Sequence, residues 1–269
     1  MQTSQASLFD QTAQREEAPS FSMFRELVDH IQSDRDAALI KLLYLGAYRV
    51  SEVSTKVAPY ETAHKMTRTY GKALRYDLTD FRVNDTELIK VLLLDSAIAK
   101  RTKERDGQEY LTFKQIALPL SKEHEPWALD LLIWARSQGA KSLSMAQKKL
   151  PEERLKDQEY MGKLGDELLH RSLRFHLCRP AIEYIIRQNL RSLLPEKNKH
   201  NLKNPLRHWR LSHLAELYDF DGFDLTMFAG WTYGSSMAGQ GASGMLDSYL
   251  HLSWKKYFKK LLVPLSEVR

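Results

Sequence analysis

The chain has 269 residues, 43% of them hydrophobic and 28% charged, which is typical of a soluble globular protein with a sizeable core. The net charge of +6 favours a polyanionic partner. The single cysteine, Cys178, excludes an internal disulfide and a cysteine-rich zinc site. No apolar run approaches the roughly 18 residues that span a bilayer, and the first residues show no apolar region of the signal-peptide kind, so we expect a soluble, cytoplasmic protein without membrane contact.

The first predicted element follows a polar, aperiodic tail at residues 1–20. A single domain is expected over residues 21–269. Ser33 is a candidate N-cap, and Asp36 stands three positions later, as in a capping box. An apolar stripe at helical spacing follows: Ala37, Ile40, Leu43, Tyr44 and Ala47. The pattern predicts a helix with Arg49 just beyond its end.

A β-hairpin is predicted at about residues 88–120. Two short apolar runs, "ELIKVLLLDSAIAK" and "EYLTFKQIALPL", flank the charged, glycine-containing segment "RTKERDG". Lys100 lies where the first strand is expected to end. Residues 54–85 are mixed and carry scattered basic side chains.

The rest of the chain is expected to be helical. A helix should begin near Pro126 and end just before Gly139, since helices favour Pro in the first turn and Gly past the end. Residues 141–170 predict a charged helical insertion broken at Pro151, and a basic amphipathic helix closes the chain at about 245–262. The fold class is therefore mainly α with a small antiparallel β-sheet (α+β).

Basic residues concentrate in three segments that could attract a phosphate backbone. They are the hairpin turn, the stretch from Arg187 to Arg210, and the closing helix. Solvated helix faces are the alternative for any one of them. The candidate DNA-binding residues are Lys197, Lys199, Lys203, Arg210, Lys255 and Lys256.

Four segments, in order, resemble the tyrosine recombinase (phage integrase) family, most closely its archaeal members. They are "LGAYRVSEV", "NPLRHWRLSHL", "FAGWTYGSSM" and "DSYLHLS". The resemblance covers about residues 22–262 and implies the catalytic domain of that family. It also implies an enzyme from an archaeal or viral mobile element that cuts and rejoins double-stranded DNA through a 3′-phosphotyrosyl intermediate, without metal or cofactor. A homotetramer on DNA is implied, with a monomer possible in free solution, at the nucleoid or in a viral host.

The resemblance implies a phosphate clamp made of Arg49 and Arg207. Guanidinium groups suit this role because they are permanently charged and donate two parallel hydrogen bonds. Glu52 would orient Arg49, and His208 would support the site. Trp231 would donate its indole N–H to the phosphate.

Tyr249 is the expected nucleophile, since a tyrosine can store the bond energy in a covalent intermediate. Two other tyrosines stand nearby, Tyr233 and Tyr257. The general acid is expected at Lys100, with Lys103 as the alternative. A cationic environment would lower the pKa of such a lysine toward neutrality.

Two positions depart from the family pattern. Asn204 stands where the family usually has His, and an amide donates a hydrogen bond but cannot take a proton. Asn204 could suffice by hydrogen bonding, His200 or His208 could replace the missing group, or the enzyme could be slow. The segment between Trp231 and Tyr249 is about twice as long as in the family and is rich in Gly and Ser.

Three other functions remain open at this point. A DNA-binding protein of the same fold could be catalytically weak or inactive. A helical interaction protein would use its basic segments only as solvated faces. A type IB topoisomerase would relax supercoils without site preference.

Overall fold

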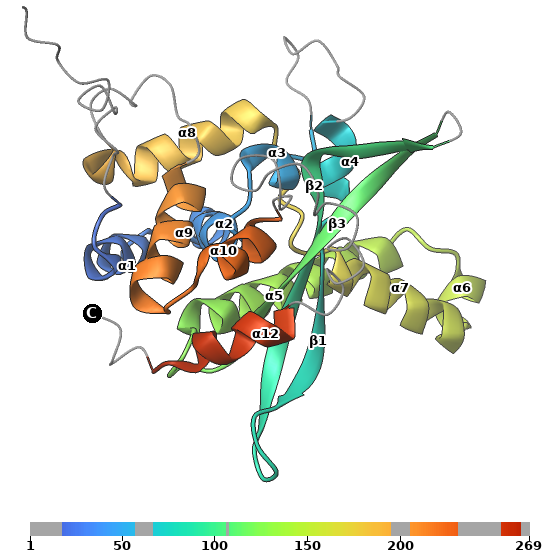
Figure 1. Ribbon diagram of the computed structural model, residues 1–269. Coiled ribbons are helices and arrows are strands. Elements are labelled where there is room, and N and C mark those ends of the chain that lie inside the picture. The colour runs from blue at the N-terminus through green and yellow to red at the C-terminus, as the bar shows by residue number, and fades with distance from the viewer. Residues whose placement is uncertain (1–17, 57–66, 106–107, 195–204, 231–253, 265–269) are drawn as a thin grey trace, which may run out of the picture.

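The structure is a computed structural model that describes residues 18–56, 67–105, 108–194, 205–230 and 254–264. Within these ranges the side chains of 67–69, 99–105, 108–111 and 255–256 lie outside the description. The described chain is mostly helical with a three-stranded antiparallel sheet, which confirms the predicted α+β class (Figure 1). None of its helices is both long and apolar enough to cross a membrane.

The described chain contains helices, 3-10 turns and strands in the following order along the sequence. The helices are α1 (Phe21–Asp29), α2 (Asp34–Leu45), α3 (Val50–Val53), α4 (Thr67–Lys72), α5 (Pro126–Gln147), α6 (Glu152–Lys156), α7 (Gln158–His170), α8 (Arg179–Asn189), α9 (Pro205–Leu217), α10 (Gly222–Ala229) and α12 (Trp254–Phe258). Two 3-10 turns are η1 (Arg191–Leu193) and η4 (Lys259–Leu262). The strands are β1 (Arg75–Arg82), β2 (Leu88–Arg105) and β3 (Gln108–Pro119).

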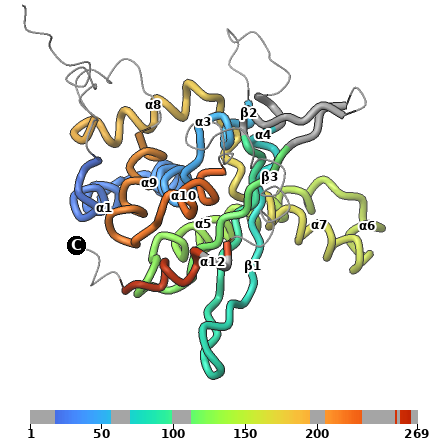
Figure 2. The backbone as a smooth tube through the Cα atoms, in the orientation of Figure 1, coloured from blue at the N-terminus to red at the C-terminus, as the bar shows by residue number. Residues whose placement is uncertain are grey.

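Both faces of the sheet are covered over its central part. The strands lie in the order β1-β2-β3, and alternate residues point to opposite faces. Leu92, Leu94, Ile116 and Leu118 join the main core beneath the helices. Val91, Leu93 and Ala117 face the other way and pack against Phe258 of α12, which crosses the sheet in Figure 2.

Helix α2 lies at the centre of the helical layer. Its N-cap is Ser33, whose Oγ accepts a hydrogen bond from the Asp36 backbone N–H at 3.3 Å, as the sequence predicts. Every residue from Leu42 to Leu45 is fully buried. Rings from α1, α5 and α9 (Phe24, Trp127 and His213) meet Tyr44 in this core, which fixes the position of α9 against α2.

Two elements differ from the sequence prediction. Helix α5 does not end before Gly139 but continues to Gln147. Gly139 is instead a contact point, because a Cβ there would lie 3.1 Å from Leu169 Cδ1 on α7. Strand β1, unexpected within residues 54–85, buries only Tyr76.

The hairpin itself is longer than expected on its first strand. Lys100 does not end β2, which continues to Arg105 after a register shift between Ala97 and Thr102. In the charged insertion, Pro151 is the N-cap of α6, so the helical path is interrupted at that residue. Of the closing helix expected at 245–262, the structure describes α12 and η4 from Trp254 onward.

Arg210 is buried, so the prediction that it contacts a DNA backbone is wrong for this conformation. Its side chain is 0% exposed and its Nη2 lies 3.3 Å from Glu125 Oε2 at the start of α5. The guanidinium also lies over the ring of Tyr44, 5.1 Å from its centroid. Arg210 therefore joins α9 to α5 inside the core.

His213 ties the N-terminal segment to α9 in its neutral form. Its Nε2 donates to the Pro19 carbonyl and its Nδ1 accepts from the Tyr44 hydroxyl, each at 2.7 Å. Burial, assisted by the positive charge of Arg210, lowers the pKa of His213 to about 4. Protonation would place a second positive charge beside a buried guanidinium.

We expect this histidine to make stability depend on pH below neutrality. A lowered folded-state pKa means that the unfolded chain binds the proton more tightly. The contribution of His213 is therefore complete above about pH 6.5 and is lost between about pH 6.5 and 4, by about 3 kcal/mol. Denaturant unfolding at pH 7 and pH 5 measures the loss. His213→Gln, which keeps both hydrogen bonds, should flatten the curve; an unchanged slope would contradict this origin.

Candidate functional site

The turn between α2 and α3 presents two backbone carbonyls to one cluster of cations. Ala47 has a φ of +43°, which costs an alanine about 1 kcal/mol and turns the chain sharply. Gly46 precedes it, and a Cβ there would lie 2.1 Å from the Tyr48 ring. The Gly46 carbonyl accepts a hydrogen bond from Lys114 Nζ at 3.0 Å, and that of Ala47 accepts one from Arg207 Nη1 at 2.5 Å.

Arg49 and Glu52 form the first pair of the cluster. Arg49 precedes the first turn of α3, and its backbone N–H donates to Glu52 Oε2 at 2.9 Å. Its Nη1 donates to Glu52 Oε1 at 3.0 Å. Glu52 is 0% exposed, whereas the Arg49 side chain is 28% exposed. The carboxylate therefore holds Arg49 at the boundary between the cluster and solvent.

Arg207 reaches the same carboxylate from α9. Its Nη1 lies 3.8 Å from Glu52 Oε2, and its Nη2 donates to the Ala229 carbonyl at the end of α10, at 2.8 Å. Burial lowers the pKa of Arg207 to about 10, although Glu52 opposes this shift. The two arginines of the predicted clamp thus converge on Glu52.

Lys114 on β3 is a member of the cluster that the sequence analysis missed. Its Nζ lies 3.9 Å from Glu52 Oε2 and 4.6 Å from the centre of the Tyr48 ring. Burial lowers the pKa of Lys114 to about 7, helped by Arg207 and Arg49 and opposed by Glu52. An ammonium group with this pKa is partly protonated at neutral pH and is suited to donate a proton.

The sequence did contain a signal for Lys114. It stands two residues before Ile116 and four before Leu118, so strand alternation places it on the face that joins the core. A lysine on such a face needs compensating partners, which the carbonyl of Gly46 and the carboxylate of Glu52 supply. Gly230 makes room for it, because a Cβ there would lie 3.1 Å from Lys114 Cδ.

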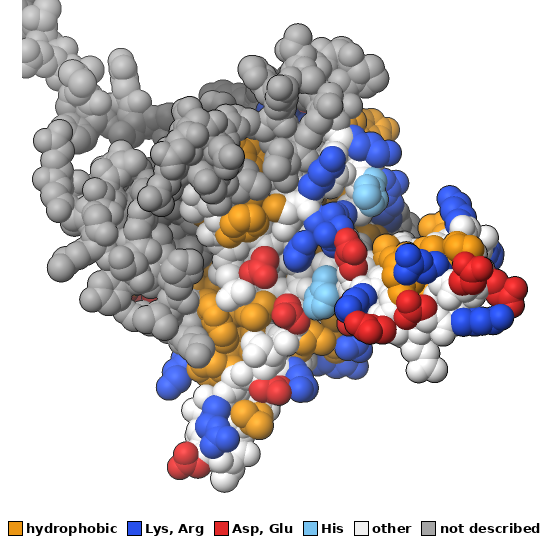
Figure 3. All heavy atoms as spheres, turned by 90° about the vertical axis from the view of Figure 1, so that its right-hand side faces the viewer, with side chains coloured by type: hydrophobic (Ala, Val, Ile, Leu, Met, Phe, Trp, Pro, Cys, Tyr) orange, Lys and Arg blue, Asp and Glu red, His pale blue; other side chains and the backbone are white. Residues whose placement is uncertain are grey.

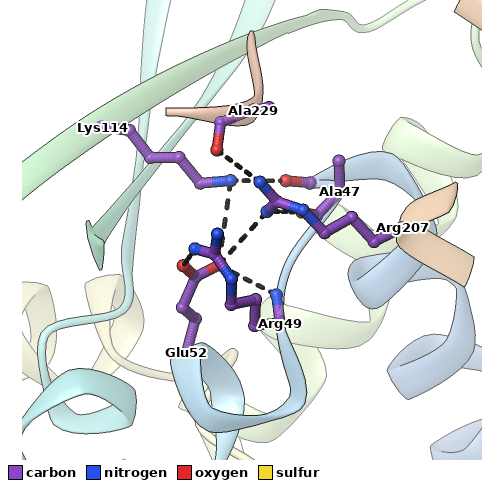
Figure 4. A network of polar contacts seen from close by, with 7 residues as sticks. Ala47, Arg49, Glu52, Lys114, Arg207 and Ala229 are labelled. Atoms are coloured by element: carbon purple, nitrogen blue, oxygen red, sulfur yellow. Dashed lines mark hydrogen bonds and ion pairs between the residues drawn. The ribbon is translucent and has the colours of Figure 1, made fainter. Parts of the chain in front are cut away.

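The cluster carries an excess of positive charge. Figure 4 shows the side chains of Arg49, Lys114 and Arg207 arranged around the single carboxylate of Glu52. Three cationic groups against one acid attract an anion, and the partly exposed Arg49 is where an anion could approach. Guanidinium forks and an ammonium group match a phosphate in both charge and donor geometry.

Most of the remaining predicted site residues lie outside the described residues or have side chains outside the description. His208 is an exposed residue of α9. Lys100 and Lys103 are on β2, and Lys255 and Lys256 on α12, with side chains outside the description. The other candidates lie outside the described residues: Lys197, Lys199, Lys203, Asn204, Trp231, Tyr233 and Tyr249.

Tyr257 is excluded as a nucleophile in this conformation. It is 1% exposed, and its hydroxyl accepts a hydrogen bond from the Ala117 backbone N–H at 3.4 Å. Burial raises the pKa of Tyr257 well above its usual value, which disfavours a phenolate.

Comparisons of the chain with models of protein families, with curated proteins and with solved structures found no match.

Proposed function

We propose that the chain is a site-specific DNA recombinase of the tyrosine type. The observation that carries the proposal is the convergence of Arg49 and Arg207 on Glu52 from α3 and α9. Both arginines stand in the segments that resemble the family's first two boxes, and the cluster has the charge to hold a phosphodiester. The partner is double-stranded DNA, on which a tetramer would assemble.

The proposed reaction is an in-line displacement at phosphorus. The Tyr249 hydroxyl attacks, its proton passes to water, and the bond from phosphorus to the 5′-oxygen breaks. The two guanidinium groups stabilise the charge that builds on the non-bridging oxygens, an effect of a few kcal/mol for each well-placed donor. A lysine ammonium gives a proton to the departing 5′-oxygen. The free 5′-hydroxyl of another strand then reverses the reaction and rejoins the DNA.

Trapping the covalent intermediate tests the proposal. A pool of nicked duplexes of random sequence would be incubated with the chain and resolved on a denaturing gel. A protein–DNA adduct should form with the original chain and be absent with Tyr249→Phe. An adduct that persists in Tyr249→Phe would exclude this nucleophile, and absence of any adduct would leave strand cleavage without support.

The second candidate function is a DNA-binding protein of the same fold that does not cleave. Two observations favour it: Arg207 already donates to the carbonyls of Ala47 and Ala229, and Asn204 cannot act as a base. Such a protein would bind DNA with a strong dependence on salt and would form no adduct. The same gel separates the two functions.

Lys114 is the proposed general acid, alongside Lys100 and Lys103. With a pKa of about 7 for Lys114, strand cleavage should fall as pH rises above about 7, because the protonated fraction decreases. Lys114→Met should slow cleavage by about 10²–10⁴-fold. Replacing the 5′-bridging oxygen of the DNA by sulfur should restore most of that rate, since a thiolate leaves without a proton.

A matched control is Lys90→Met, which removes an exposed lysine of β2. It should leave both the rate and its pH dependence unchanged. If sulfur substitution rescues Lys100→Met or Lys103→Met instead of Lys114→Met, the proton donor is the rescued residue. If it rescues none of them, the loss in Lys114→Met reflects charge or packing.

A further inference from the structure

A second basic site lies on the side of α5 and α7 and uses none of the residues of the cleavage cluster. It is a pocket of about 350 Å³ between α2, α5 and the segment from the end of α7 toward α8. Three arginines and one histidine line it: Arg35, Arg171, Arg174 and His176. None of its described lining residues is acidic. A pocket with this lining selects for negative charge.

The arginines of the pocket keep donors that the described part of the chain does not use. Arg174 Nε donates to the Leu74 carbonyl at 3.1 Å, which fixes the side chain along the wall. Arg171 pairs through Nη1 with Glu167, while its buried Nε has no hydrogen-bond partner among the described residues. Arg35 is exposed in the first turn of α2. The Arg171 side chain is 37% exposed, so its guanidinium group remains accessible to an anion in the pocket.

Positive charge continues from the pocket in two directions. Burial, with Arg171 and Arg75 nearby, lowers the pKa of Arg174 to about 10. Burial, with the positive charges of Lys56 and Arg174 nearby, lowers the pKa of His176, so this side chain adds a neutral hydrogen-bonding group rather than charge at neutral pH. Arg75 begins β1, and Lys56 follows α3, the helix that carries Glu52. The face shown in Figure 3 carries Lys, Arg and His side chains, with Asp and Glu side chains among them.

The extent of this charge favours a polymer over a small anion. The pocket is larger than a single phosphate needs, and Arg75 and Lys56 carry further positive charge near Arg174 and His176. Trp134 and Phe175 also line it, stacked 4.6 Å apart, and offer an apolar wall for a sugar ring. A nucleic-acid strand presents regularly spaced phosphates together with sugars.

We propose that this pocket binds a backbone phosphate of a DNA strand, distinct from the phosphodiester held at the cleavage cluster. The inference rests on the proposed function for the identity of the partner. The contact positions the duplex without reading its sequence, because arginines bound to phosphates carry no base information. It would extend the footprint of the chain beyond the cleavage site.

Salt dependence of DNA binding tests the proposal. The double variant Arg35→Gln/Arg171→Gln removes two cations of the pocket. Its control, Lys156→Gln/Lys163→Gln, removes two exposed cations of α6 and α7 with the same change in net charge. For a duplex of random sequence, the slope of log K against log salt should fall by about 0.9 in the pocket variant, the change expected for the loss of one phosphate contact. The control should keep the original slope.

Equal slopes for the pocket variant and its control would overturn the proposal, as would a chain that binds no DNA. A calorimetric titration with inorganic pyrophosphate separates the other source of phosphate. If pyrophosphate binds the original chain but not the pocket variant, and the salt slopes for DNA binding are equal, the site binds a free phosphorylated molecule. The slopes report binding and the Tyr249 adduct reports cleavage, so either idea can fail alone. Thermal unfolding of each variant confirms that the fold is retained.

Discussion

Replacing Glu52 with Gln is expected to lower the free energy of unfolding by about 3–5 kcal/mol. Glu52 is fully buried and is the acid that Arg49, Lys114 and Arg207 share. Glutamine keeps the size and can still accept the hydrogen bond from the Arg49 backbone, so the loss reports the charge. Chemical denaturation at neutral pH measures it.

The control for this substitution is Glu153→Gln, which neutralises an exposed acid in the first turn of α6. Its effect should stay within about 0.5 kcal/mol, as for most surface changes. Sulfate should restore part of the stability of Glu52→Gln, since an anion that binds only the folded state stabilises it. A loss below about 1 kcal/mol without any sulfate effect would mean that solvent already screens these charges, contrary to the buried cluster.

Arg49→Lys is expected to slow formation of the covalent adduct by about 10²–10³-fold. Lysine keeps the positive charge, so DNA affinity should change little, but it lacks the planar fork that donates to two phosphate oxygens. Because the Arg49 side chain is 28% exposed, the fold should tolerate the change. Single-turnover cleavage of nicked duplexes measures the rate.

The matched control is Arg191→Lys, at an exposed position of η1. It should leave both cleavage and DNA affinity unchanged. Equal cleavage rates for Arg49→Lys and the original chain would show that this guanidinium does not act on the reacting phosphate. A parallel loss of affinity and rate would assign it to DNA binding alone.

Local patterns predicted the elements whose signals lie within a few residues. Ser33 and Asp36 mark the start of α2 because N-capping depends only on neighbouring backbone groups. Glu52 was expected to orient Arg49, and the two side chains pair because they stand only three positions apart at the start of α3. Strand β1 escaped prediction because only one of its side chains is buried, which leaves little alternation to detect.

The features that were not predicted depend on contacts between segments that lie far apart in the sequence. Helical geometry makes Arg207 and Arg210, three positions apart, neighbours on α9, and it does not reveal that one meets Glu52 and the other Glu125. Arg210, which was expected on a DNA-binding surface, is therefore buried in the interior. Likewise, glycine is common just past the end of a helix, but Gly139 lies inside α5. Its lack of a side chain allows Leu169 of α7 to approach closely.

The candidate site was foreseen only in part, for the same reason. The motifs identified Arg49, Glu52 and Arg207, and the structure brings these three together. Lys114 was not predicted because it lies in none of the four segments that resemble the family. Strand alternation with Ile116 and Leu118 nevertheless places it on the inward face of β3. The basic pocket at Arg171 and Arg174 joins three helices and a connecting segment, and no local pattern encodes such a meeting.

A crystal structure of Tyr249→Phe bound to an uncleaved duplex, selected from the adduct-forming pool, tests the central claim most directly. The account predicts one phosphodiester within hydrogen-bonding distance of both Arg49 and Arg207, with Glu52 behind them. A duplex whose phosphates all lie elsewhere, with both guanidinium groups still engaged only by Glu52 and the backbone carbonyls, would contradict it.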